Sequence, residues 1–132
     1  MTAGKKAAIT RATGSYTVDE HFEGKSETIR DLAIAVIDYV TGLDPSIQVS
    51  PKKYYIAFKL AKNLACMEVQ KRQVVLFLKL DPSRHKGPPG ISRNVANIGH
   101  FGTGDLEVTL KTGKDLEATK SWIELAYREI GA

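Results

Sequence analysis

Apolar residues recur with the period of an α-helix in two stretches, one near each end of the chain. The first covers residues 26–41 and has its apolar stripe at Ile29, Leu32, Ala33, Val36, Ile37 and Val40. Gly42 follows it and offers a left-handed C-terminal stop. The second covers residues 112–130, where Thr112 and Asp115 have the spacing of a capping box. The sequence therefore predicts an N-terminal and a C-terminal helix.

Between these stretches the hydrophobic period changes to two, which is typical of β-strands. Three alternating runs, residues 54–60, 64–70 and 74–80, are joined by short polar turns and predict an antiparallel meander. Residues 105–111 predict another strand, and residues 95–101 are a further candidate. The expected fold class is α+β: a mainly antiparallel sheet of four to five strands, with both helices on one face.

The length of 132 residues indicates one domain, which we assign to residues 15–132. Residues 1–14 contain lysines but little periodicity, and we expect a flexible basic tail without a signal peptide. The longest apolar run, residues 74–78, is far shorter than the ~20 residues that cross a bilayer, so we expect no membrane partner. The single cysteine, Cys66, favours a reduced, cytoplasmic compartment.

Charge is distributed unevenly along the chain. Residues 47–95 hold ten basic residues and two acids, a net +8, whereas the rest of the chain carries −4. A positive surface of this kind indicates a polyanionic partner, either nucleic acid or an acidic protein. Part of the charge lies in residues 81–94, which glycine and proline predict to be an irregular loop. The candidate nucleic-acid-binding residues are Lys52, Lys53, Lys59, Lys79, Arg84, Lys86 and Arg93.

Four aromatic residues lie among these cations: Tyr54, Tyr55, Phe58 and Phe77. Aromatic rings beside lysines on a sheet hold single-stranded nucleic acid in several folds. Successive residues of a strand face opposite sides of the sheet, so only some of these rings are open to a ligand.

Residues 99–105, with the sequence GHFGTGD, look most like a motif. Glycines let backbone amides approach a phosphate closely. Here the glycines precede a predicted strand, whereas those of dinucleotide and P-loop motifs open a helix. We therefore favour a tight turn entering the strand over a phosphate loop.

The sequence offers little that favours catalysis. No two histidines, and no histidine and cysteine, have metal-ligand spacing, so we expect no metal and no cofactor. Cys66 lies in an apolar run, which is typical of a buried core cysteine rather than a nucleophile. Restriction-type nuclease sites need an acid, any residue and then lysine. The second residue after Glu68, and the second after Glu107, is not a lysine. This counts against nuclease activity.

Four segments together resemble a known family. They are Tyr16 with Glu20-His21, the run PKKYYIAF at residues 51–58, the run IGHFGTGDLEV at residues 98–108, and Ala126-Tyr127. This pattern resembles the bacterial DUF5655 family of domains of unknown function, whose members are often labelled "predicted transport protein". The resemblance implies a helix–sheet–helix domain similar to the double-wing type. Members often accompany endonuclease-like proteins, which implies an accessory role in restriction or endonuclease-type systems.

The resemblance also implies that His21, His100, Thr103 and Asp105 lie together, as a polar cluster or a small-ligand site. No reaction is established for the family, so no catalytic residue is transferred. Three hypotheses follow: a non-catalytic nucleic-acid-binding module, a small-ligand-binding domain or enzyme using the His21, His100 and Asp105 region, and a protein-interaction domain for an acidic partner. The oligomeric state is left open.

Overall fold

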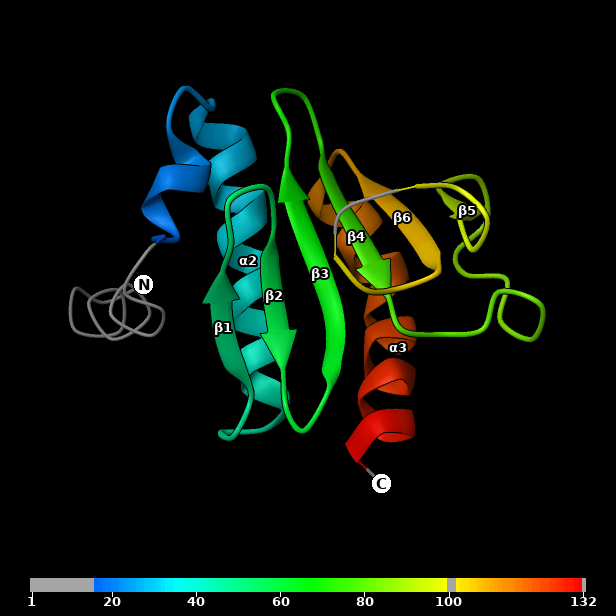
Figure 1. Cartoon of the computed structure of the whole chain (residues 1–132). Coiled ribbons are helices and arrows are strands. Elements are labelled where there is room, and N and C mark those ends of the chain that lie inside the picture. The colour runs from blue at the N-terminus through cyan, green and yellow to red at the C-terminus, as the bar shows by residue number, and fades with distance from the viewer. Residues whose placement is uncertain (1–15, 100–101, 132) are drawn as a thin grey trace.

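The computed structural model describes residues 16–99 and 102–131, so the predicted tail (residues 1–14) and His100 lie outside the described residues. Figure 1 shows the chain from its N-terminus in blue to its C-terminus in red. The described elements are, in chain order, η1 (Asp19–Phe22), α2 (Glu27–Leu43), β1 (Gln48–Pro51), β2 (Ile56–Lys59), β3 (Asn63–Val69), β4 (Val74–Leu78), β5 (Ser92–Asn94), β6 (Leu106–Leu110) and α3 (Gly113–Gly131).

The strands form one antiparallel sheet in the order β1-β2-β3-β4-β6-β5. Helices α2 and α3 both lie behind this sheet in Figure 1 and share one core with it. The predicted α+β class, with an N-terminal and a C-terminal helix on one face of an antiparallel sheet, is confirmed. Within the described residues the sheet has six strands, against the four to five predicted.

The two additional strands are short, and one of them lies where a loop was predicted. β1 pairs with β2, and β5, inside the segment 81–94, pairs with β6. The predicted strand at residues 95–101 is wrong over its described part, which forms turns. One cause is Asn94, whose side-chain oxygen accepts a hydrogen bond of 2.9 Å from the Ala96 amide and so bends the chain.

The helix ends follow largely from their capping residues. Ser26 caps α2, because its hydroxyl accepts a hydrogen bond from a first-turn backbone amide at 3.2 Å. The stop predicted at Gly42 is wrong, since α2 continues through this residue. Thr112 and Asp115 form the predicted capping box at the start of α3: each side chain accepts a hydrogen bond from the other residue's amide, at 3.4 and 3.3 Å.

The main hydrophobic core lies between the helices and the sheet. The stripe predicted on α2 is fully buried there, and alternate residues of β4 and β6, such as Leu76 and Val108, pack against it. Neither α2 nor α3 is long and apolar enough to cross a membrane, and no other helix within residues 16–99 and 102–131 is either.

A second, smaller cluster lies on the sheet face turned away from the helices, here called the outer face. It consists of Ala57, Cys66, Val75, Phe77 and Val95, with Tyr55 packed beside it. Residues 102–105, which lead into β6, lie on this face in Figure 1. Gly104, with a φ of +129°, lies so close to Phe77 that a Cβ on it would be 2.6 Å from the Phe77 carbonyl carbon. Gly102 and Gly104 therefore let the backbone of residues 102–105, here called the glycine block, lie directly on the sheet.

Candidate functional site

The basic residues of the middle segment all reach solvent. Each of the ten basic residues between positions 47 and 95 is exposed. Among the described residues, only Arg93 of these ten forms an ion pair with a carboxylate. The two acids of the segment are held by neighbours: Glu68 accepts a hydrogen bond from Gln70 at 3.2 Å, and Asp81 accepts two from Ser83 at 2.7 and 2.9 Å. The excess positive charge is thus available at the surface.

The sheet topology divides these cations between its two ends. Lys52 and Lys53 lie in the β1–β2 turn, at the end of the sheet where β3 turns into β4. Lys59 is the last residue of β2 and Lys79 directly follows β4, so both lie at the opposite end of the sheet. The seven predicted residues therefore do not form one compact patch.

Arg84 and Lys86 lie on the loop that connects β4 to the far edge of the sheet. His85 between them anchors this loop to α3, with its Nε2 3.1 Å from a carboxylate oxygen of Glu129. The His85 ring also forms a T-shaped contact with the ring of Trp122, at a centroid distance of 6.4 Å. The His85 side chain points toward α3, and its neighbours Arg84 and Lys86 are exposed.

Arg93 differs from the other six predicted cations because it already has an anionic partner. Its Nε and one terminal nitrogen donate hydrogen bonds to the two carboxylate oxygens of Glu107, at 3.2 and 3.0 Å. This two-point contact raises the pKa of Arg93, since it favours the charged form. A phosphate would have to compete with Glu107 for this guanidinium.

Of the four aromatic residues predicted near the cations, one is widely exposed. Phe58 and Phe77 are buried, and Tyr55 packs against the outer-face cluster. Tyr54, in the β1–β2 turn, is 53% exposed. The Nζ atom of Lys53 lies 5.3 Å from the centroid of the Tyr54 ring, a cation–π contact.

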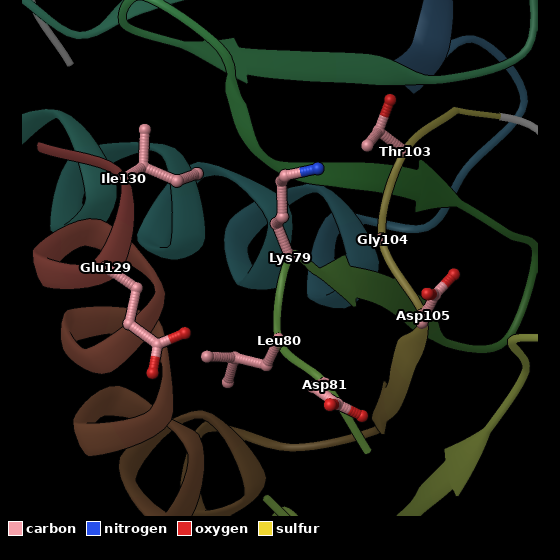
Figure 2. A pocket seen from close by; sticks show the side chains of 8 residues that line it. All are labelled: Lys79, Leu80, Asp81, Thr103, Gly104, Asp105, Glu129 and Ile130. Atoms are coloured by element: carbon pink, nitrogen blue, oxygen red, sulfur yellow. The ribbon is translucent and has the colours of Figure 1, made fainter. Parts of the chain in front are cut away.

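The glycine block borders a hollow of about 340 Å³, shown in Figure 2. Thr103 and Asp105 line one side and Glu129 of α3 lines the other, with Lys79 between them. The Thr103 hydroxyl is 3.5 Å from the side-chain nitrogen of Asn63. The hollow is lined by three carboxylates and one ammonium group, so it does not favour phosphate.

His21 does not line this hollow. It lies in η1, and its Nε2 is 2.7 Å from the carbonyl oxygen of Lys52, beside the β1–β2 turn. Asp105 comes just before β6, at the opposite end of the sheet. The structure thus brings Thr103 and Asp105 together but leaves His21 apart from them.

Cys66 is buried under the glycine block. The Thr103 amide donates a hydrogen bond to its sulfur at 3.2 Å, and burial raises the pKa of the thiol. A neutral, covered thiol is a poor nucleophile. Within residues 16–99 and 102–131, no group of three or more His, Cys, Asp or Glu side chains is arranged to hold a metal ion.

Comparison with known proteins identifies a family for this chain. The chain matches the family described as "Domain of unknown function (DUF5655)" over residues 18–129. The chain belongs to this family. It is also 31% identical over 114 residues to an uncharacterized protein of Haemophilus influenzae, and the match covers 86% of this chain and 38% of the relative. The chain therefore spans less than half the length of that relative. No solved structure matches.

Two features of this DUF5655 chain were missed from the sequence. The first is the Arg93–Glu107 pair, which depends on the pairing of β5 with β6. The second is that Lys111 and Lys114, outside the segment 47–95, lie at the same end of the sheet as the β1–β2 turn. Both features depend on which strands pair over long range, and no local pattern in the sequence reports that.

Proposed function

We propose that this protein is a non-catalytic nucleic-acid-binding module that contacts phosphates. The observation that carries the proposal is that all ten basic side chains of residues 47–95 are exposed and, within the described part of the chain, nine of them have no carboxylate partner. Exposed, unpaired cations attract a phosphate backbone, and binding releases the counterions condensed on it. This term needs no base contact, so we expect little sequence preference.

The basic surface supports this proposal better than the hollow beside the glycine block supports a small-ligand site. The hollow is lined by Asp81, Asp105 and Glu129, and two of these carboxylates are already engaged, with Ser83 and His85. An acidic protein remains the competing partner, because a basic face can bind either a nucleic acid or an acidic protein.

The longer relative gives the proposed module a context. A domain that spans 38% of its relative is suited to act beside other segments, and an accessory role next to a nuclease fits a module that holds nucleic acid. A cytoplasmic location would give it access to that ligand.

The test is a fluorescence-anisotropy titration of the chain against labelled DNA and RNA at several salt concentrations. If about four cations engage phosphates, the log–log salt slope on duplex DNA is near −3 to −4, since each neutralised phosphate contributes about −0.9. Polyglutamate serves as the comparison ligand. Binding to polyglutamate but to no nucleic acid at low salt overturns the proposal in favour of an acidic protein partner.

A further inference from the structure

Three connections bring cations to one end of the sheet. The β1–β2 turn, the β3–β4 turn and the β6–α3 connection all lie at the upper end of the sheet in Figure 1, here called the three-turn end. It carries six exposed cations: Lys52, Lys53, Lys71, Arg72, Lys111 and Lys114. Neighbouring strands are about 4.8 Å apart, so three and a half strand spacings extend this row over roughly 17 Å.

Three acids near this end accept hydrogen bonds within the fold. Glu68 accepts a hydrogen bond from Gln70, and Asp115 accepts two from the backbone amides at the start of α3, at 2.8 and 3.3 Å. Glu20 on η1 accepts a hydrogen bond of 2.7 Å from the Thr17 amide. The helix layer here carries both signs, including Glu27 and Arg30. Residues 52–55, 70–73 and 111–114 contain no acid, so the row of turns is positive.

The same end presents the most exposed aromatic ring of the described residues. Tyr54 is 53% exposed, and the bond between His21 and the Lys52 carbonyl holds its turn against η1. An exposed ring stacks on any unpaired base, whereas in a duplex the bases are already stacked and covered. A ring beside a row of cations is the combination that single-strand binders use.

From this juxtaposition we infer that the three-turn end binds single-stranded nucleic acid, with phosphates along the six cations and one base on Tyr54. The inference rests on the proposed function and deepens it. It assigns the contact with single strands to one end of the sheet and adds Lys111 and Lys114, which lie outside the basic middle segment.

The test compares two triple variants that remove the same charge from opposite ends of the sheet. The first is Lys52→Ala with Lys71→Ala and Lys111→Ala. The matched control is Lys59→Ala with Lys62→Ala and Lys79→Ala. All six side chains are exposed and have no ion pair within the described residues, so both variants keep the fold, which thermal melting checks. The probes are labelled oligothymidylate and a mixed-sequence duplex.

We expect the first variant to flatten the salt slope on oligothymidylate by about two, at about 0.7 per phosphate, and the control to change it much less. Tyr54→Ala lowers the affinity for oligothymidylate roughly five- to a hundredfold, and Tyr54→Phe keeps it. Equal losses from both triple variants, no effect of Tyr54→Ala, or a preference for the duplex overturns the inference and leaves the proposed function standing. If the unaltered chain binds neither probe, the proposed function fails as well.

Discussion

The Nε2 atom of His21 lies 2.7 Å from the backbone carbonyl oxygen of Lys52. A carbonyl oxygen only accepts hydrogen bonds, so Nε2 carries the proton and donates it. This contact joins η1 to the β1–β2 turn and so to the three-turn end. Burial lowers the pKa of His21 because it disfavours the charged imidazolium, although the bond to Lys52 and the nearby Glu20 act in the opposite direction.

The first prediction concerns pH. The ordinary pKa of a histidine, as in the unfolded chain, is 6.5. A histidine whose pKa is lower in the folded state binds fewer protons there than in the unfolded chain. Its contribution to stability is therefore complete above pH 6.5 and declines as pH falls through the folded pKa. His21→Gln retains a donor but does not titrate, so the free energy of unfolding should fall less than in the unaltered chain between about pH 7.5 and about pH 5.

Urea unfolding at both pH values measures this difference. The control is His85→Gln, which removes a histidine that contacts Glu129 instead. A pH dependence unchanged by His21→Gln would show that the His21 contact does not couple to folding. His21→Ala should lower stability by roughly 0.5–1.5 kcal/mol near neutral pH, as for the loss of one hydrogen bond.

The second prediction concerns the glycine block. Gly104→Ala places a Cβ 2.6 Å from the carbonyl carbon of Phe77, at a φ of +129° that L-residues rarely adopt. We expect a loss of about 1–3 kcal/mol in the free energy of unfolding, because the loop must lift from the sheet. Chemical denaturation measures it.

The matched control is Gly42→Ala, in the interior of α2. Nothing lies within 4 Å of a Cβ there and φ is not positive, so alanine should stabilise the chain by about 0.5–1 kcal/mol. If Gly104→Ala behaved like Gly42→Ala, the close approach to Phe77 would be contradicted.

The helices were predictable because several independent signals coincide. The apolar stripe of α2 and the Thr112–Asp115 capping box act within one element, so they are visible in a single sequence. The strands β2, β3 and β4 were predictable because their period-two alternation also lies within one element. β5 was not: Ser92–Asn94 has no apolar alternation and is a strand only because β6 lies beside it.

The candidate site was predictable in its charge but not in its arrangement. Exposure of the ten cations follows from residue type, since lysine and arginine are rarely buried. Which cations lie together depends on which turns meet at one end of the sheet, and that follows from the long-range strand order. The placement of Tyr54 in a turn, and of Phe58 in the core, depends on strand boundaries that differ by a few residues from those predicted.

The third prediction concerns the thiol. Cys66 is fully buried, and burial raises its pKa, so little thiolate is present at neutral pH. Iodoacetamide should modify native Cys66 slowly, and denaturant should accelerate the reaction strongly. Ala61→Cys, at an exposed turn, is the control and should react rapidly in the native chain. Mass spectrometry distinguishes the two sites, and equally rapid native labelling of Cys66 would show that the glycine block does not cover it.

The fourth prediction concerns the pair between Arg93 and Glu107. Both carboxylate oxygens of Glu107 hold the guanidinium, at 3.2 and 3.0 Å, so a phosphate reaches Arg93 only by displacing them. We therefore expect Arg93→Ala to weaken nucleic-acid binding less than Lys86→Ala, whose ammonium has no ion-pair partner among the described residues. Anisotropy titrations over a range of salt measure both affinities.

Replacing Glu107 instead of Arg93 tests whether Glu107 withholds Arg93 from phosphate or whether only the net charge of the protein matters. Glu107→Gln frees the guanidinium and should raise affinity and steepen the duplex salt slope by about 0.9 for one newly engaged phosphate. Asp105→Asn also removes one negative charge, here from an exposed side chain. Asp105 has no ion-pair partner among the described residues, so its replacement frees no cation and should raise affinity less. Most of the gain from Glu107→Gln should disappear in the Arg93→Ala background. If the gain persists there, or if Asp105→Asn matches it, Arg93 is not the group that Glu107 withholds from phosphate.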